Sequence, residues 1–532
     1  MSSSKRYRLT TPAKVLILLV ALVVIAGGLF GAVKMGWVKT DSPVKNNKDV
    51  KLLNDLTDSD GNVVNTEKTD KSTINLSLDE WIGWKEIIDA NGGLSTKQGS
   101  IYDKLGIKVN ISVINDATQS SNALISGDLD AAGYTINRTA FLSKKFKDAN
   151  IDVIMPYITN FSNGGDGIIA TQNIKSVNDF VGAKIGVPQF SEAHTLVVWF
   201  VNQSDLSDND KKKIISDLVF FETPDEAAKA FFAGELDMAA TWEPYLTQAQ
   251  NMGDAKIFFS TKSASSLVMD GILFNDKFAK ENAEVVSKFI DGALQASDLY
   301  DKDMETIKSV MPMFSTASNE EVKDNCSGAK LMTYADNLSQ FTGAAKSIFT
   351  DMCKVWKSIG EETNDELINT LFDDTYIKTL ESKYSNTEIT KSDAVVKVDS
   401  SNELSVEKAD AMLKKSATVN FIKSTAKFSD TKEASSVLED FIKTAKVLDG
   451  TIIQIEGNTD PNPYSDPKDT LNKKLSKSRA ETVKKYFVMN GIDADRIVVI
   501  GNGSSKPIAK NDTEANRAKN RRTDISFKSL EQ

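Results

Sequence analysis

The chain has 532 residues, and its 64 Lys and Arg stand against 74 Asp and Glu, which gives a formal net charge of −10 at pH 7. A chain of this length is expected to form several domains, and an acidic balance without a long basic run disfavours a nucleic-acid partner. One His and two Cys disfavour a zinc site, because His/Cys sites need three or four such ligands together. We therefore expect a binding protein, not an enzyme, with no catalytic residue, no metal and no cofactor.

The N-terminal residues predict a membrane anchor. Residues 1–14 carry only positive charges, and residues 15–33 form an uncharged apolar run. As a helix this run is about 28 Å long, enough to cross a bilayer core. The basic residues favour a cytoplasmic tail at 1–14, which puts the rest of the chain outside. The alternative is a cleaved secretory signal, but Gly31-Ala32-Val33-Lys34 makes a poor cleavage site. The expected location is the cell membrane, with a single pass and extracytoplasmic C-terminal domains.

Two polar stretches divide the rest of the chain. Residues 40–73 and 385–414 lack sustained apolar periodicity and are predicted to be linkers. Between them, at 74–384, strand-like and helix-like segments alternate, which is typical of α/β architecture with largely parallel strands. A last block occupies 415–532.

The two cysteines, Cys326 and Cys353, lie in the predicted extracytoplasmic part. In that setting they either form a disulfide or remain buried free thiols, and their spacing leaves both alternatives open.

A short pattern occurs twice in the 74–384 block. In residues 124–132 and 231–239 a helix-like segment ends at a glycine and continues through an acidic-Leu-Asp turn into a strand of small residues. Two such units suggest two α/β lobes, with ligand-binding loops after the strands at Gly133-Tyr134-Thr135 and Thr241-Trp242-Glu243-Pro244-Tyr245. Thr223-Pro224-Asp225-Glu226 predicts the start of the second helix. The alternative is coincidence, because helix, glycine and strand follow one another in many proteins.

Several short motifs in this block agree in order and spacing with one family. They are Ile74-Asn75-Leu76-Ser77-Leu78 with Trp81-Ile82-Gly83-Trp84, Gly127-Asp128-Leu129-Asp130-Ala131, Ser162-Asn163-Gly164-Gly165-Asp166-Gly167, Lys184-Ile185-Gly186-Val187-Pro188 and Thr241-Trp242-Glu243-Pro244-Tyr245. With them the block resembles ABC-transporter substrate-binding proteins of the sulfonate, nitrate, taurine and thiamine-precursor type. The resemblance implies a two-lobed, hinged periplasmic-binding-protein-like fold that closes on a small solute and presents it to an ABC permease.

Nine side chains are candidates for the solute site: Trp81, Trp84, Thr118, Ser121, Tyr134, Asp166, Ser191, Trp242 and Glu243. Hydroxyls at helix starts favour an anion. Acids such as Asp166, Glu243, Glu80 and Glu192 instead suit a cation, to which the Trp faces add cation-π attraction, so the charge of the solute stays open. Each Trp has core or hinge packing as its alternative, Thr118 and Ser121 have helix capping, and the acids have an exposed surface position. His194 either donates to the ligand or serves as a surface or capping residue.

The last block reads as α+β. It predicts strands at 417–421, 451–456 and 496–500 and helices at 435–446 and 477–489. It contains Gly457-Asn458-Thr459-Asp460, Asn472 with Leu475-Ser476 and Arg479-Ala480, Gly491-Ile492, Gly501 with Gly503, Pro507 and Asn520-Arg521-Arg522. With these motifs it resembles the OmpA-like peptidoglycan-binding domain.

The resemblance implies a binding pair for the peptide stem of peptidoglycan. Asp460 and Arg479 take the roles of the pair, with Thr459, Asn472 and Leu475 shaping the pocket. A guanidinium binds a carboxylate in a fork, and a carboxylate accepts from an ammonium or amide, so the pair suits a zwitterionic end group. Arg521 and Arg522 add positive charge. Asn458 replaces the family's usual His, and Pro461, Pro463 and Pro467 lengthen the next loop, so Asp469 is a reserve candidate for the acid.

The predicted assembly is a membrane-anchored extracytoplasmic solute-binding protein, of the kind that serves an ABC importer, which also binds peptidoglycan non-covalently. The alternative is a structural or sensory envelope protein that bridges membrane and cell wall without transport.

Overall fold

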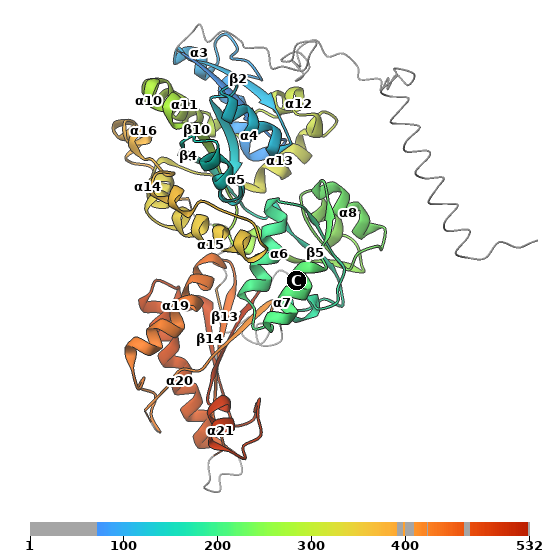
Figure 1. Ribbon diagram of the computed structural model, residues 1–532, viewed down its shortest axis with the longest axis vertical. Coiled ribbons are helices and arrows are strands. Elements are labelled where there is room, and N and C mark those ends of the chain that lie inside the picture. Colours follow the sequence, from blue (N-terminus) through green and yellow to red (C-terminus); the bar gives the residue numbers. More distant parts are fainter. Residues whose placement is uncertain (1–71, 391–396, 399–408, 423, 462–468, 530–532) are drawn as a thin grey trace, which may run out of the picture. The chain divides into compact units, whose positions relative to one another are not determined.

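The computed structural model describes residues 72–390, 397–398, 409–422, 424–461 and 469–529 (Figure 1). The predicted tail at 1–14, the predicted transmembrane run at 15–33 and nearly all of the predicted linker at 40–73 lie outside these residues. In the described part of the chain, no helix is both long and apolar enough to span a membrane.

The first sheet has six strands in the order β11-β4-β10-β3-β1-β2. β1 pairs in parallel with β2 and β3, whereas β10 is antiparallel to both β3 and β4. Every residue of β3 and β4 is buried, as expected for central strands covered on both faces. The strands are β1 Thr73–Leu78, β2 Lys108–Val113, β3 Ala131–Thr135, β4 Val153–Ser162, β10 Met269–Asn275 and β11 Ala329–Leu331.

The second sheet has five strands in the order β7-β6-β8-β5-β9. β6 pairs in parallel with β7 and β8, and β5 is antiparallel to β8 and β9. Its strands are β5 Asp166–Thr171, β6 Ile185–Pro188, β7 Val219–Phe221, β8 Met238–Trp242 and β9 Ala255–Ser260, and its helices are α6 Glu192–Gln203, α7 Asp208–Ser216, α8 Pro224–Phe232 and α9 Tyr245–Gln250.

The chain crosses between the two sheets twice. It passes from β4 to β5 through residues 163–165 and returns from β9 to β10 through residues 261–268 (Figure 1). Residues 166–260 therefore form a second lobe inserted into a first lobe, and the expected two-lobed α/β architecture is confirmed.

The first lobe contains most of the helices of this domain. Two groups flank the inserted lobe in sequence: α2 Lys85–Asn91, α3 Ile101–Lys104, α4 Ala117–Ser126 and α5 Ile136–Asp148 before it, and α10 Asp276–Glu281, α11 Ala283–Ala296, α12 Glu305–Val310, α13 Asn319–Ser327, α14 Tyr334–Thr342, α15 Ala344–Ser358, α16 Thr375–Lys378 and α17 Glu381–Tyr384 after it. Short 3₁₀ turns lie at Ile82–Trp84, Val177–Phe180, Thr261–Ser263, Ser297–Leu299, Pro312–Phe314, Asp365–Asn369 and, in the C-terminal domain, Ala494–Arg496.

The repeated pattern occupies equivalent places in the two lobes. α4 leads into β3 and α8 leads into β8, and the glycines that follow the two helices have the left-handed φ of 82° and 76°. Thr223 caps α8 and accepts a hydrogen bond from the Glu226 amide, as predicted. The expected loop at Gly133-Tyr134-Thr135 is wrong: these residues complete β3, and Thr135 is already the N-cap of α5.

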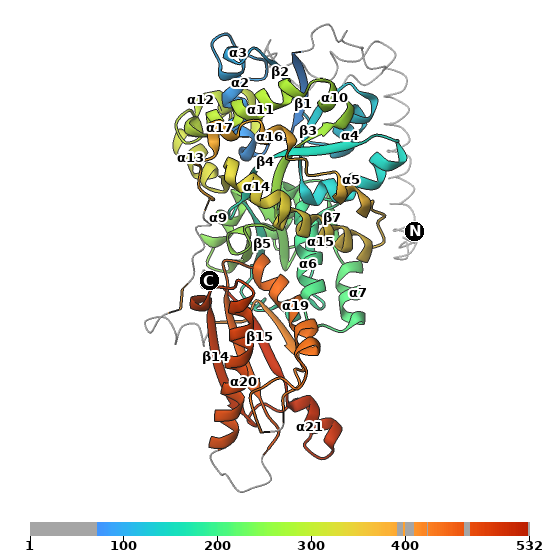
Figure 2. The same ribbon diagram turned by 90° about the vertical axis from the view of Figure 1, so that its left-hand side faces the viewer.

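The C-terminal domain is a four-stranded sheet with helices, as expected. Its strand order is β12-β15-β13-β14, with β13 parallel to β14 and antiparallel to β15. Figure 2 shows α20 running beside these strands. The elements are β12 Leu413–Ala417, β13 Ile452–Asn458, β14 Ile497–Gly503, β15 Thr523–Lys528, α19 Thr431–Val447, α20 Thr470–Met489 and α21 Glu514–Asn520.

Two glycines bring α20 close to this sheet. A Cβ on Gly457 of β13 would lie 2.1 Å from the Ser476 carbonyl oxygen, and one on Gly501 of β14 would lie 2.5 Å from the Lys473 carbonyl oxygen. Only residues without a side chain allow the helix backbone this approach. Arg479 lies one turn further along the helix, so this contact determines its distance from the end of β13.

Several predicted boundaries differ from the structure. The expected strand at 417–421 lies four residues earlier, because Leu413, Lys415 and Ala417 alternate inward and pair with β15. α20 begins at Thr470 instead of 477, since its first turns bury the polar Asn472 and Ser476, which hydrophobic periodicity does not detect. The first lobe extends beyond 384, because the Thr390 hydroxyl donates to Asp336 Oδ2 at 2.6 Å.

Cys326 and Cys353 are both buried and unbonded to each other. Burial raises the pKa of each thiol to about 12. The sequence left a disulfide and two free thiols as alternatives, and in the structure both cysteines are free thiols.

Candidate functional sites

Four carboxylates gather where the two lobes meet, and we call them the carboxylate cluster: Asp79, Asp166, Glu192 and Asp270. Asp79 directly follows β1 and Asp270 lies in β10, both in the first lobe, whereas Asp166 begins β5 and Glu192 begins α6 in the second. They lie close enough to one another to interact electrostatically. Both lobes therefore contribute acid groups to one site.

Two tryptophans hold the first-lobe members of the cluster. Trp84 Nε1 donates to Asp79 Oδ1 at 2.6 Å, and Trp81 Nε1 donates to Asp270 Oδ2 at 2.9 Å. Trp81 also donates to Asn160 Oδ1 at 3.3 Å. Trp84 is 1% exposed, so it is a core residue that orients an acid. The ring edge of Trp81 packs on the crossover, because a Cβ on Gly165 would lie 2.5 Å from it.

One ion pair joins the lobes at the cluster. Arg138 Nη2, from α5 of the first lobe, lies 2.9 Å from Glu192 Oε2, and both side chains are about five-sixths buried, at 16% and 15% exposure. The Thr135 hydroxyl donates to Glu192 Oε1 at 2.7 Å. Ser191 is the N-cap of α6, as predicted, and accepts from the His194 amide at 3.2 Å.

Burial makes three of these acids, Asp79, Asp166 and Asp270, hard to ionise. Burial raises the pKa of Asp166 to about 7. The negative charges of Glu192 and Asp79 contribute to this rise, and the hydrogen bond with the Ser162 side chain partly offsets it. Burial also raises the pKa of Asp270 well above its usual value, and Asp79, Asp166 and Glu192 raise it further. For Asp79 burial raises the pKa, and Arg138 and Trp84 offset part of the rise.

Two buried polar atoms around the cluster make no hydrogen bond to any described residue. Arg138 Nε and Trp242 Nε1 are donors without an acceptor. Asp270 is 3% exposed, and of its carboxylate oxygens only Oδ2 accepts a hydrogen bond. Trp242 pairs directly with Asp166 across β8 and β5, so the two side chains stand on the same face of the second sheet.

Tyr134 lies beside the cluster, whereas two of the predicted hydroxyls do not. Tyr134 is 4% exposed, and its hydroxyl lies 2.5 Å from that of Ser120. Thr118 is exposed on α4, whose cap is Asp116, and Ser121 is buried, bonded to the Thr118 carbonyl and to Lys145. The structure therefore does not bring Thr118 or Ser121 to the cluster, and neither caps the helix.

Glu243 and His194 lie in other surroundings. Glu243 accepts from the amide and the hydroxyl of Thr247 and so caps α9. It lines a pocket of about 990 Å³ together with the crossover residue Gly164 and, in α13, Asp324. His194 is 2% exposed, its Nε2 has no partner among the described residues, and burial lowers its pKa to about 4.

Sequence reasoning missed Asp79, Arg138 and Asp270. A usable signal existed for Asp270, which interrupts the apolar run Val268 to Phe274 on a strand. An acid in a strand buried on both faces indicates a special role, because an unpaired carboxylate there is costly.

In the C-terminal domain Asp460 and Arg479 lie together. Asp460 follows β13, and Arg521 Nη1 is 2.9 Å from its Oδ2. Arg479 Nε donates to the Thr425 carbonyl at 3.1 Å, and its guanidinium lies 4.9 Å from the centre of the Phe421 ring. Burial and the neighbouring Arg521 lower the pKa of Arg479, while Asp460 raises it. Nη1 and Nη2 of Arg479 make no hydrogen bond to the described residues.

The other predicted members of this site lie around the pair. Thr459 is 5% exposed, and its hydroxyl has no hydrogen-bond partner in the described ranges. Asn472 Nδ2 donates to the Asp460 carbonyl at 3.4 Å and to Asp469 Oδ1 at 2.7 Å. Leu475 is half-buried on α20. Asp469 also accepts from the Ser504 amide, so the reserve acid candidate is occupied in holding the loop.

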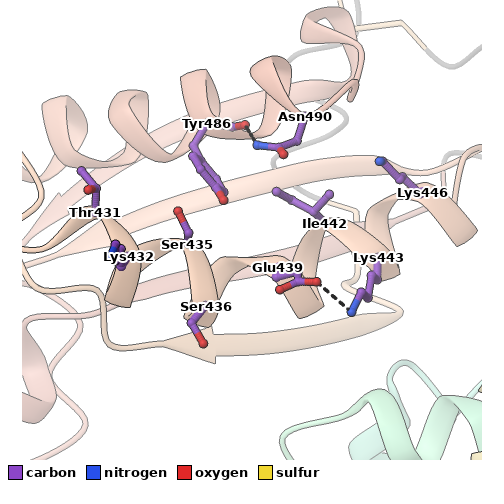
Figure 3. A pocket seen from close by; sticks show the side chains of 10 residues that line it. All are labelled: Thr431, Lys432, Ser435, Ser436, Glu439, Ile442, Lys443, Lys446, Tyr486 and Asn490. Carbon is purple, nitrogen blue, oxygen red and sulfur yellow. Dashed lines mark hydrogen bonds and ion pairs between the residues drawn. The ribbon is translucent and has the colours of Figure 1, made fainter.

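A second hollow in this domain lies away from the pair. It is a pocket of about 640 Å³ between α19 and the end of α20 (Figure 3). Its lining includes Lys432, Lys443 and Tyr486, and Lys443 is paired with Glu439 at 3.0 Å. Sequence reasoning did not predict it.

No metal centre is present in the described parts of the chain, where no three His, Cys, Asp or Glu side chains are arranged to hold an ion.

Two family models match separate parts of the chain. Residues 95–303 match the model described as NMT1/THI5 like, and residues 420–521 match the OmpA family. The chain thus combines an NMT1/THI5-like domain with an OmpA-family domain.

Curated relatives match the C-terminal part. Outer membrane protein A of Bordetella avium is 41% identical over 108 residues, which cover 20% of this chain and 52% of that protein. The peptidoglycan-binding protein ArfA of Mycobacterium tuberculosis is 44% identical over 66 residues, or 12% of this chain and 20% of that protein. The chain thus spans about half or less of the length of these relatives.

The periplasmic aliphatic sulphonate binding protein of Escherichia coli is similar in structure over 57% of this chain and 99% of its own. The identity is 15% and the TM-score 0.45.

Proposed function

We propose that the chain is an extracytoplasmic solute-binding protein that also binds the peptide stem of peptidoglycan. The solute sits at the carboxylate cluster between the lobes, and the stem end group sits between Asp460 and Arg479. The observation that supports the first site most is that acid groups from both lobes meet there, beside the buried Arg138 Nε and Trp242 Nε1, which have no partner among the described residues.

The two crossovers explain how such a site can open and close. Only residues 163–165 and 261–268 join the sheets, so rotation about two short segments separates the lobes. A solute held by Asp270 of the first lobe and Asp166 of the second gains contacts only when the lobes are together. Binding then favours the closed form, which differs in shape from the open one and can be recognised by a permease.

The C-terminal site has a chemistry that fits a peptide stem. Nη1 and Nη2 of Arg479 make no hydrogen bond to the described residues and suit a carboxylate, and Asp460, whose Oδ2 pairs with Arg521, can also accept from an ammonium or amide. The name of the relative ArfA includes peptidoglycan binding. Residues 15–33 would anchor the protein in the cell membrane, which puts the solute site between membrane and wall.

Thermal unfolding of the full chain in detergent tests the solute-binding part. The probes are taurine, nitrate, phosphate, amino acids, pyrimidines and organic amines. A solute at a hundred times its Kd stabilises the native state by about 2.7 kcal/mol, enough for a clear rise in Tm. A rise with one chemical class is expected, and no rise with any of them contradicts the proposal.

The second candidate function is a structural or sensory bridge between membrane and wall. The ion pair of Arg138 with Glu192 favours this alternative, because the pair joins the lobes in the absence of a solute. Unchanged solute uptake after deletion, together with altered envelope integrity, is the result expected for that alternative.

A further inference from the structure

The carboxylate cluster has an unbalanced charge. It contains four acids, and the one cation that faces them among the described residues is Arg138. Arg138 already pairs with Glu192 at 2.9 Å. Asp79, Asp166 and Asp270 are thus left without a cationic side chain of their own.

Asp270 and Trp242 give a second and independent indication of a ligand. Asp270 is only 3% exposed, and its Oδ1 accepts no hydrogen bond from the described residues. Trp242 Nε1 is buried and has no acceptor. Buried polar atoms are nearly always paired in native proteins, so the open donor of Trp242, on a residue that pairs with Asp166, indicates a group supplied from outside.

We propose that the solute is a small organic cation whose ammonium or amidinium group binds between Asp270 of the first lobe and Asp166 of the second. This inference rests on the proposed function, since it names the chemical class that the interlobe site accepts. Asp79, oriented by Trp84, adds negative charge to the same space. Trp81 and Trp242 offer aromatic faces, and Trp242 Nε1 donates to an acceptor on the body of the solute.

An anion does not fit this arrangement. A helix N-terminus is the usual anion site, but α6 begins with Glu192, and its cap Ser191 already occupies the His194 amide. A sulfonate or nitrate would also approach three acids that have no cationic partner.

The raised pKa values support a proton-linked mechanism. Without a cation, burial and the neighbouring acids favour the protonated forms of Asp79, Asp166 and Asp270, and this exceeds the opposing effect of Arg138 on Asp79 and of the hydrogen bonds from Trp84, Trp81 and Ser162. A bound cation favours the ionised forms, so binding releases protons. Affinity is then expected to fall as the pH is lowered through 7, the pKa of Asp166.

Isothermal titration calorimetry of the full chain in detergent at pH 8 tests the inference. The cation probes are agmatine and putrescine, the anion probes are taurine and nitrate, and Mg²⁺ tests for a metal ion. We expect heat with at least one organic cation, and heats that differ between phosphate and Tris buffers because protons are released.

Variants locate the binding group. Asp270→Asn keeps the shape and removes the charge, so its Kd for the cation is expected to rise on the order of tenfold to a hundredfold, the effect of one charge-assisted hydrogen bond. The control Asp254→Asn removes the same charge from an exposed turn of the second lobe, and no change is expected.

The contradicting results can be told apart. Binding of taurine or nitrate, or of Mg²⁺, without binding of an organic cation overturns the inference and leaves the proposed solute binding intact. Cation binding that is equal in wild type and Asp270→Asn, with no buffer dependence, also overturns it. No binding of any probe contradicts solute binding itself, and the inference with it.

Discussion

Arg479 is positioned on three sides by residues of its own domain. The Thr425 carbonyl fixes Nε, the Phe421 ring supports the plane of the guanidinium, and Asp460 lies near enough to raise its pKa. Less freedom is lost when such a side chain binds a ligand. The same burial makes it costly to leave the charge unpaired, so a carboxylate ligand is favoured.

Replacement of Arg479 tests the peptidoglycan site. Arg479→Ala is expected to abolish pelleting of the full chain with purified peptidoglycan, and Arg479→Lys is expected to weaken it on the order of tenfold, because Lys keeps the charge and loses the planar fork. Lys443→Ala, in the pocket between α19 and α20, is the control and should pellet like the wild type. Equal pelleting of the wild type and Arg479→Ala would reject the assignment.

Asp166 makes the stability of the protein depend on pH. Its pKa is about 7 in the folded chain and 3.8 in the reference state, so the folded state binds more protons between these values. Its contribution to stability is present below pH 4 and is lost as the pH rises through 7. The shift in the pKa of Asp166 changes the free energy of unfolding by roughly 4 kcal/mol at most between low and high pH.

Asp166→Asn is therefore expected to raise the Tm relative to wild type at pH 8 and to have a smaller effect at pH 4.5. Thermal unfolding without solute, compared at the two pH values, measures this. His194 has the opposite dependence, because its pKa falls from 6.5 to about 4 and its contribution is lost as the pH falls through that range. His194 is present in both the wild type and Asp166→Asn, so its contribution to stability cancels when the two proteins are compared. A Tm difference that does not change with pH contradicts the buried ionisable role of Asp166.

At the scale of elements, the approach of α20 to β13 and β14 determines where the peptidoglycan pair stands. Gly457→Ala would put a Cβ 2.1 Å from a helix carbonyl. We expect a loss of about 1–3 kcal/mol in unfolding free energy, as for other overpacked sites, and weaker wall binding because Arg479 moves away from Asp460. Gly253→Ala, which meets no atom within 4 Å, is the control. Denaturant unfolding and pelleting of both variants check the two parts of the prediction.

The elements that sequence predicted best are those with regular apolar patterns or strong caps. The start of α8 at Thr223 and the repeated helix-strand units are of this kind. α20 was predicted seven residues too short at its start, because Asn472 and Ser476 face the sheet where the pattern requires apolar residues. These polar residues hold neighbouring loops, since the Gly503 amide donates to the Ser476 hydroxyl and Asn472 donates to Asp469.

The candidate sites differ in how far sequence could predict them. Asp460 and Arg479 could be proposed from sequence because a motif identifies each position, and the structure brings the two side chains close enough to interact. The interlobe site was found only in part, since Asp79, Arg138, Asp166 and Asp270 lie far apart in sequence and the pairing of two sheets brings them together. Single positions such as Thr118 look suitable in sequence, but Thr118 is exposed on α4, and Asp116 caps that helix.

At the scale of the whole molecule, the two proposed sites lie in separate domains and take different ligands. Residues that share no partners are expected to act additively. Arg479→Ala should leave solute binding unchanged, and Asp270→Asn should leave wall binding unchanged. Calorimetry of the first variant and pelleting of the second measure this independence.

The most direct test of the central claim measures both activities at once. The full chain is mixed with purified peptidoglycan and with a radiolabelled form of the organic cation that gives heat in the titration, and the pellet is counted against a sample without protein. Wild type is expected to bring protein and label into the pellet together. Asp270→Asn should pellet without the label, and Arg479→Ala should keep both in the supernatant. Label and protein distributions that are the same for all three proteins would contradict the account.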